Sequence, residues 1–287
     1  MKAIAAKCSN FQGECQLDGR GIINIERGLM GFYNLKIINC GDRRLEIYYS
    51  KDYKIKTGEV KKKNVQCVKI KSEEELKYEK RKNKLTNLNN SRNKINRLIA
   101  SNPDLDKFIT LTYSGSVSME ESKKQLAYFF TKLRRKQRNL KYIWILEFQG
   151  NGNIHYHVLT NFDIKIDISK YRKTEKHKEV ERIFAAEFWK WGFVDIRNLK
   201  QEGNTNVAKY LTAYLTKEMF DKEMEGKRVF GYSKSTVDKP IITKILEDVD
   251  QEQLLKKFED YKIKFTNSYG IGSFKDRVNY FDMVKEK

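Results

Sequence analysis

Histidine and proline are scarce in this sequence, and several signatures of other protein classes are missing. The 287 residues include 3 histidines and 2 prolines. No apolar run reaches the roughly 18 residues that a membrane-spanning helix needs, and the opening MKAIAAKCSNFQ lacks the apolar stretch of a secretory signal. We therefore expect a cytoplasmic protein with no membrane partner. No GxxxxGKS/T loop occurs, which excludes a fused P-loop helicase and predicts no nucleotide cofactor.

Cysteine is also sparse, and its spacing argues against a structural metal. The four cysteines are Cys8, Cys15, Cys40 and Cys67, and none belongs to a CxxC pair. Because structural zinc usually takes closely spaced ligand pairs, ordinary reduced thiols are the favoured interpretation. A small zinc site in the first quarter of the chain is the alternative.

Positive charge is abundant. The chain has 58 Lys and Arg against 38 Asp and Glu, a formal net charge of +20. An excess of this size favours a polyanionic partner, because cationic side chains release the counterions condensed on it. Nucleic acid is the first candidate.

The two prolines, Pro103 and Pro240, stand near the expected edges of a central domain. We expect a small β-rich module over residues 1–71, a basic helix over residues 72–100, a central domain over residues 101–240 and a helical, aromatic appendage over residues 241–287.

The residue 72–100 helix begins with a capping box, Ser72 with Glu75, and carries an apolar stripe. That stripe consists of Leu85, Leu88, Ile95, Leu98 and Ile99. The cations on its other faces form either an ordinary solvated surface or a contact with the DNA backbone. The candidate DNA contacts are Lys80, Arg81, Arg92 and Arg97, with Arg134 and Arg135 from the next helix.

The central domain alternates strands and helices. Strands are expected at residues 108–113, 141–149, 154–161 and 193–197, and helices at residues 119–138, 176–191 and 206–219. The order β-α-β-β-α-β followed by a helix predicts an α+β fold, a ferredoxin/RRM-like antiparallel sheet with helices on one face.

A candidate metal site lies on the hairpin of this domain. His155 and His157 are two residues apart on one strand, so both imidazoles point to the same side of the sheet. The turn at residues 150–153 sets Glu147 opposite His155. Two imidazoles and a carboxylate can hold one divalent ion, and Mg²⁺ or Mn²⁺ suits a site that also takes phosphate. The alternative is a pair of hydrogen-bonded structural histidines. His177 stands alone on a basic helix and is expected at the surface.

The last helix of the domain carries a polar stripe. Tyr210, Tyr214 and Lys217 lie within about 60° of one another around a helix. Val207, Leu211 and Leu215 supply the buried side of that helix, so the phenols are free to face the sheet.

Three motifs together resemble those of HUH rolling-circle replication initiators from plasmids and phages of Gram-positive bacteria. They are residues 108–112 (FITLT), Glu147 with His155-Tyr-His157, and Tyr214-Leu-Thr-Lys217. The resemblance covers about residues 80–240. It implies a metal-dependent endonuclease that binds single-stranded origin DNA and keeps the 5′ end on a tyrosine, leaving a 3′-OH for a host polymerase after a host helicase opens the duplex. Lys217 would position the phosphate or the phenol.

The resemblance departs from the family at one place. Some relatives carry lysine three residues after both tyrosines, but Ala213 follows Tyr210 here. Tyr214 is therefore the expected nucleophile, and Tyr210 is either a second nucleophile or a packing residue. Two other interpretations stay open: an HUH transposase or relaxase with the same chemistry, and a non-catalytic module that binds single-stranded nucleic acid.

Overall fold

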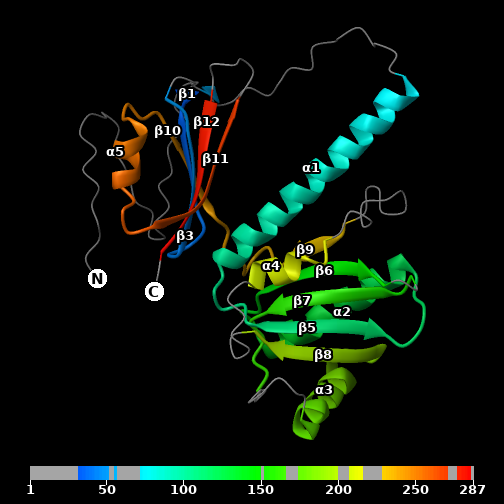
Figure 1. Ribbon diagram of the computed structural model, residues 1–287. Helices are drawn as coiled ribbons and strands as arrows, with labels where there is room; N and C mark the ends of the chain where they lie inside the picture. Colours follow the sequence, from blue (N-terminus) through cyan, green and yellow to red (C-terminus); the bar gives the residue numbers. More distant parts are fainter. Residues whose placement is uncertain are drawn as a thin grey trace.

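Two five-stranded antiparallel sheets form the body of the protein, and the long helix α1 (Glu73–Ala100) runs between them (Figure 1). The computed structural model describes residues 32–51, 55–56, 72–149, 152–165, 174–199, 207–215, 228–270 and 277–285. A separate two-stranded pair joins β1 (Phe32–Tyr33) to β4 (Ile55–Lys56). Among the residues described, no helix is both long and apolar enough to cross a bilayer.

The core sheet contains the four strands expected from the sequence and one more. Its order is β8-β5-β7-β6-β9. The strands are β5 (Lys107–Tyr113), β6 (Tyr142–Phe148), β7 (Ile154–Thr160), β8 (Gly192–Asn198) and β9 (Phe230–Tyr232). The short edge strand β9 was not expected, because three residues carry too little alternation to be recognised.

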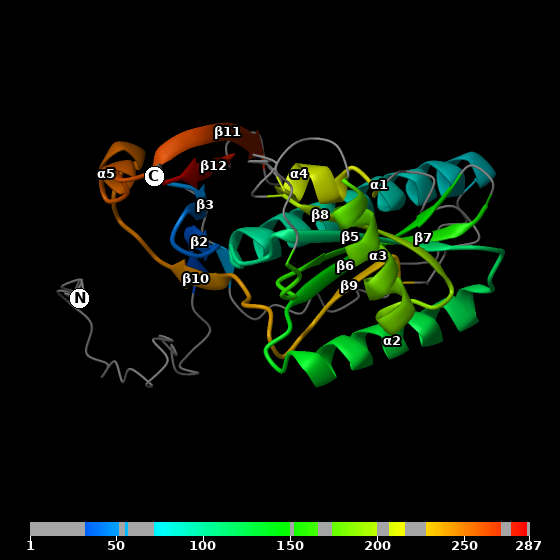
Figure 2. The ribbon, with the colours of Figure 1, turned by 90° about the horizontal axis from the view of Figure 1, so that it is seen from below.

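Helices lie on both faces of the core sheet (Figure 2). The helices α2 (Met119–Lys136) and α3 (Glu175–Phe188) pack on one face, where Phe129 and Phe184 are in contact. The other face meets α4 (Val207–Thr212) and the last turns of α1. We call this second face the histidine face, because His155 and His157 point to it. The sequence predicted helices on one face, and the difference comes from the docking of α1 and α4.

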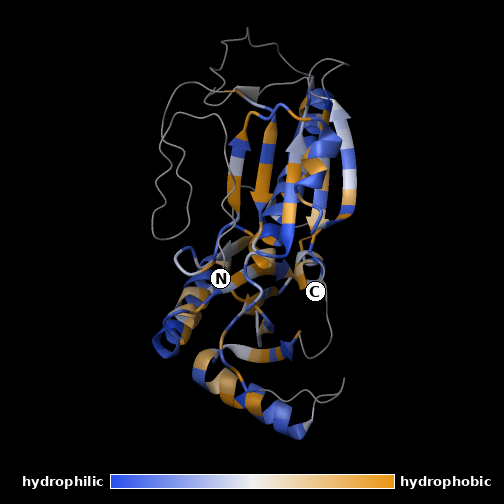
Figure 3. Cartoon of the chain, turned by 90° about the vertical axis from the view of Figure 1, so that its left-hand side faces the viewer, coloured by the Kyte–Doolittle hydropathy of each residue, from blue (hydrophilic) through white to orange (hydrophobic). Residues whose placement is uncertain are grey.

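The second sheet joins strands from the two ends of the described chain. Its order is β10-β2-β3-β12-β11. The strands are β2 (Leu35–Asn39), β3 (Arg44–Tyr49), β10 (Ile241–Ile245), β11 (Lys262–Gly270) and β12 (Arg277–Val284). Apolar and polar residues alternate along these strands (Figure 3). The apolar side packs on α5 (Gln251–Lys256), which contributes Leu254 to the core beneath it. Residues 1–71 and 241–287 were expected to form separate modules, whereas strands from both form this single sheet.

The basic helix α1 is anchored only along its second half. Its capping box, Ser72 with Glu75, is formed as expected. Leu88 and Ile95 are buried, but Leu85 is 44% exposed because the helix has left the body of the protein by that turn (Figure 1). Near its end, the Arg97 guanidinium donates to the buried Glu46 carboxylate of β3, with a closest distance of 2.7 Å. This ion pair ties the helix to the second sheet.

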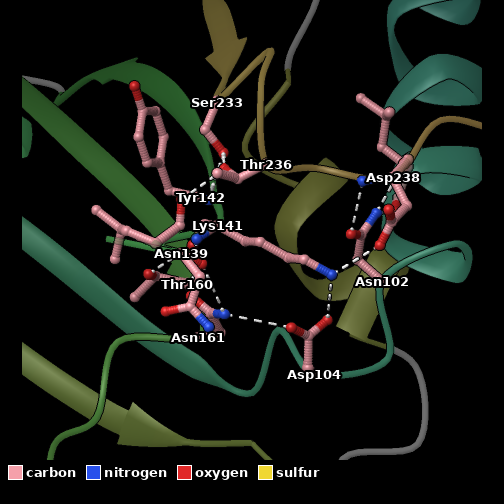
Figure 4. Close-up of polar contacts among 12 residues, drawn as sticks. Asn102, Asp104, Asn139, Lys141, Tyr142, Thr160, Asn161, Ser233, Thr236 and Asp238 are labelled. Atoms are coloured by element: carbon pink, nitrogen blue, oxygen red, sulfur yellow. Dashed lines mark hydrogen bonds and ion pairs between the residues drawn. The ribbon is translucent and has the colours of Figure 1, made fainter. Parts of the chain in front are cut away.

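A polar network fixes the connection between the two sheets (Figure 4). Asn102, just after α1, is fully buried, and its side-chain N–H donates to the carbonyls of Leu98 at 2.7 Å and Asp238 at 2.9 Å. Its Oδ1 accepts from the Asp238 backbone N–H at 2.9 Å. Lys141 adds ion pairs to Asp238 at 2.7 Å and Asp104 at 3.3 Å. The segment between β9 and β10 is thereby held against the end of α1.

We expect Asn102→Ala to lower the free energy of unfolding by about 2–3 kcal/mol, because it leaves buried backbone groups of Asp238 without partners. Urea denaturation of the full chain measures the change. Asn139→Ala is the matched control, since the Asn139 side chain is exposed and only its backbone carbonyl is used in the network. That control should change stability by less than about 0.5 kcal/mol. Equal effects of the two substitutions would contradict the anchoring role of Asn102.

Candidate functional site

The hairpin of β6 and β7 brings the predicted metal ligands to one face. Glu147 pairs directly with His155 in the antiparallel register, as the turn length predicted. His157 pairs with Ile145 on one side and Thr110 on the other, so it points to the same face as His155. Both imidazoles are buried.

Each imidazole has a distinct polar environment. His157 Nε2 lies 2.6 Å from Glu147 Oε2, and its Nδ1 lies 3.3 Å from the Thr110 hydroxyl. In the neutral ring, Nε2–H donates to the carboxylate and the Thr110 hydroxyl donates to Nδ1. The Nε2 atom of His155 is buried with no hydrogen-bond partner in the described structure. Burial lowers the pKa of both histidines, and the charge of Glu147 opposes that shift. Both therefore favour the neutral form that binds metals.

The three side chains do not yet surround a common point. Within the described residues, no group of three His, Cys, Asp or Glu side chains is arranged to hold a metal ion. His157 and Glu147 bond directly to each other instead. The donor chemistry nevertheless fits a divalent ion, because His155 Nε2 is an orphaned buried donor atom next to a carboxylate.

The tyrosines of α4 lie over the histidine face, as the sequence predicted. The ring of Tyr214 stacks on His157 with centroids 3.6 Å apart, and Tyr210 packs edge-on against Phe108 of β5 at 4.9 Å. The Tyr214 hydroxyl donates to the Tyr210 hydroxyl at 3.4 Å. Leu211 and Leu215 are fully buried on the other side of the same turn. This packing holds both phenols beside the candidate metal ligands.

A cation that was not expected from the sequence contacts Tyr210. The Arg197 guanidinium of β8 donates to the Tyr210 hydroxyl and lies 5.1 Å from the centre of its ring. The expectation that only Tyr214 has a nearby cation is therefore wrong. Burial, followed by the hydrogen bond to Tyr210, raises the pKa of Tyr214, while Arg197 acts in the opposite direction. Tyr214 is therefore a protonated phenol at neutral pH until another group takes its proton.

The comparisons with known proteins bear on this same part of the chain. Residues 106–219 match a family model described as Replication-associated protein, of the ORF2 group. The match supports a rolling-circle replication initiator. No curated protein and no solved structure matches the chain.

The matched segment covers about two fifths of the chain and begins next to β5. It contains every candidate ligand and both tyrosines, and it extends past Lys217. Lys217 itself lies outside the described residues. The second sheet lies outside the match, so the similarity to replication-associated proteins concerns the core sheet and α4.

The candidate DNA contacts have different surroundings. Lys80 and Arg81 are exposed on the free half of α1, and Arg135 is exposed on α2. Arg134 donates to the Tyr142 hydroxyl at 2.6 Å, and Arg92 donates to the Leu215 carbonyl at 2.6 Å. Arg97 forms the ion pair with Glu46 described above. Contact with DNA stays a prediction for all six, and Arg134, Arg92 and Arg97 already bind groups within the protein.

Two other expectations concern His177 and the cysteines. His177 is buried rather than at the surface: its Nε2–H is shared between the Ile196 carbonyl at 2.9 Å and the Glu181 carboxylate at 3.2 Å. It therefore links α3 to β8. Cys40 is buried with its thiol near the Ile38 carbonyl. The other three cysteines lie outside the described residues, so the zinc alternative is untested.

Thr110 and Arg197 are further residues of the histidine face that were not singled out from the sequence. Thr110 orients the His157 ring, and Arg197 bonds to Tyr210. Strand alternation is the signal that could have found them, because Thr110 pairs with His157 and Arg197 pairs with Phe108 on the same face.

Proposed function

We propose that this protein initiates rolling-circle replication by nicking single-stranded origin DNA on the histidine face. The stacking of Tyr214 on His157 is the observation that carries the proposal, because it places a phenol nucleophile beside the candidate metal ligands. The match to replication-associated proteins over residues 106–219 supports it. The order β8-β5-β7-β6 agrees with a ferredoxin-like β-α-β-β-α-β unit of the HUH type.

Glu147, His155 and His157 would hold one Mg²⁺ or Mn²⁺ ion. When bound, such an ion polarises the scissile phosphate and neutralises its developing charge. Thr110 keeps the His157 ring in place through Nδ1, as hydrogen-bond partners of metal-binding histidines commonly do. Glu147 is the part of the set that remains about one third exposed, so the site opens on its side toward substrate.

Tyr214 is the proposed nucleophile, and Tyr210 positions it. The Tyr214 oxygen attacks phosphorus, the bond from phosphorus to O3′ breaks, and the leaving O3′ takes a proton to become a free 3′-OH. The products are a 5′-phosphotyrosine and a primer for a host polymerase. The Arg197 guanidinium would stabilise negative charge on the Tyr210 oxygen, which makes Tyr210 a suitable acceptor for the Tyr214 proton. A later 3′-OH can attack the phosphotyrosine and rejoin the strand.

Metal dependence tests this proposal. The full chain is incubated with labelled single-stranded DNA from its own locus, with Mn²⁺ or with EDTA, and the products are run on a denaturing gel. We expect cleavage and a protein–DNA adduct with the ion and neither in EDTA. Binding that persists in EDTA, with no adduct under any condition, would favour a non-catalytic binding module instead.

We also expect DNA binding to weaken steeply with salt, because the candidate contacts are to phosphates. Replacing both Lys80 and Arg81 with alanine should reduce the slope of log K against log salt by about 0.7 for each phosphate of a single strand that is no longer neutralised. Fluorescence anisotropy over a salt series measures it. Lys77→Ala is the control, because Lys77 already pairs with Glu73 at 2.8 Å. A flat salt dependence would rule out backbone contacts as the main source of affinity.

A further inference from the structure

The second sheet presents a face of aromatic and cationic side chains opposite α5. Strand alternation puts Tyr48 of β3 and Tyr280 of β12 on this side, while Ile47 and Phe281 face α5. We call this surface the aromatic face, and its members are Lys36, Tyr48, Phe265, Tyr269 and Tyr280. It lies on a part of the fold that the similarity to replication-associated proteins does not reach.

The rings of the aromatic face form a row toward the edge of the sheet. Tyr48 and Tyr280 have centroids 4.8 Å apart, and Phe265 follows at 6.2 Å from Tyr280. Phe265 is 55% exposed, and Tyr269 is 41% exposed. The ammonium of Lys36 lies 5.2 Å from the centre of the Tyr48 ring. Large exposed rings with a cation over one of them are costly to leave in water, and such surfaces commonly bind a partner.

A groove continues the aromatic face between the second sheet and α1. Its volume is about 570 Å³, and its walls include Tyr48, Asn93, Lys94, Arg97, Tyr232 and Lys239. Lys94 lies 5.3 Å from the centre of the Tyr232 ring. Lys94 and Lys239 are exposed, and neither belongs to an ion pair within the described residues. Because Tyr232 belongs to β9, the groove leads to the edge of the core sheet.

Positive charge dominates this region. The carboxylates described on this face are Glu46 and Asp282, and both are bound by arginines: Arg44 pairs with both, and Arg97 pairs with Glu46. Burial lowers the pKa of Lys36, and the charges of Arg97 and Lys244 lower it further. An anion in the groove would relieve that repulsion.

We propose that the aromatic face and the groove bind single-stranded DNA, separately from the histidine face. Unpaired bases would stack on Tyr48, Tyr280 and Phe265, and phosphates would contact Lys94 and Lys239. Stacking platforms beside a cationic groove are how proteins bind single strands without sequence preference. Duplex DNA is excluded from this mode because its base faces are already stacked. Binding of this kind does not depend on the proposed nicking.

The test compares two variants of the full chain in EDTA, where no cleavage can interfere. The double variant Phe265→Ala with Tyr280→Ala removes two rings of the row. Tyr128→Ala is the matched control, because Tyr128 of α2 is 47% exposed with Lys132 lying 5.4 Å from its ring centre, away from this face. Binding to a long labelled oligothymidylate should weaken at least about tenfold for the double variant, the loss expected for two base stacks. The control should bind like the wild type.

A duplex of the same length distinguishes stacking from charge. Its affinity should be the same for all three proteins. Wild-type affinity of the double variant for the oligothymidylate, or an equal loss for duplex and single strand, would overturn the proposal. If the double variant does not fold, photo-cross-linking of the wild type to an iodouracil-containing strand decides. Cross-links within residues 262–270 or 277–284 support the site, and cross-links confined to the core sheet and its helices exclude it.

Discussion

Replacing His157 with alanine is expected to abolish metal-dependent nicking while leaving DNA binding largely intact. The imidazole is buried, bonds to Glu147 and supports the ring of Tyr214, so its loss removes a proposed ligand at the point closest to the phenol. A metal that polarises phosphate contributes several kcal/mol, so the nicking rate should fall at least ~10³-fold. Single-turnover cleavage of labelled single-stranded DNA in Mn²⁺ measures the rate.

Tyr156→Phe is the matched control for this substitution. Tyr156 lies between the two histidines on β7 but points to the opposite face, where its hydroxyl lies 2.9 Å from the Ser122 hydroxyl of α2. Its loss should cost about 1 kcal/mol of stability and leave nicking unchanged. If His157→Ala nicks like Tyr156→Phe, His157 is not a ligand and the metal assignment fails.

The second large effect is expected at the tyrosines. Tyr214→Phe should eliminate the covalent protein–DNA adduct, because the ring still stacks on His157 but the attacking oxygen is gone. Tyr210→Phe should slow adduct formation roughly 10²-fold without eliminating it, the size of the effect expected when a proton acceptor is removed. Denaturing gels give the yields, and mass spectrometry of the DNA-linked peptide identifies the residue.

The same pair of variants tests the choice between the tyrosines. Arg197 bonds to Tyr210, so the position of this cation taken alone favours Tyr210 as the nucleophile. An adduct that persists in Tyr214→Phe and disappears in Tyr210→Phe would assign the nucleophile to Tyr210. Arg197→Lys distinguishes the roles further, since lysine keeps the charge but loses the fork geometry of the guanidinium.

Features with a short sequence period could be predicted from the sequence. Period-two alternation placed His155 and His157 on one side of β7, and the hairpin turn set Glu147 opposite His155. His177 shows a signal that was available and missed. Glu181 lies four residues after it, and Phe184 continues the same buried face of α3. Neutral histidines with an i+4 carboxylate on an apolar face are typically internal.

Long-range pairing could not be predicted. The strand β10 pairs with β2 although about 200 residues separate Ile241 from its partner Asn39, and nothing local in either segment specifies that partner. The contact between Arg197 and Tyr210 has the same origin, since it depends on how α4 docks on the sheet rather than on the pattern of either element.

The most direct test of tyrosine-mediated nicking follows the two ends of one cleaved strand. Single-stranded origin DNA is labelled in parallel at its 5′ end and at its 3′ end, incubated with the wild-type protein and Mn²⁺, and denatured. A 5′-phosphotyrosine predicts that only the 3′-end label migrates with the protein, while the 5′-end label appears on a free fragment with a 3′-OH that a polymerase extends. Cleavage that leaves neither label on the protein, or that attaches the 5′-end label, would contradict nucleophilic attack by a tyrosine of α4.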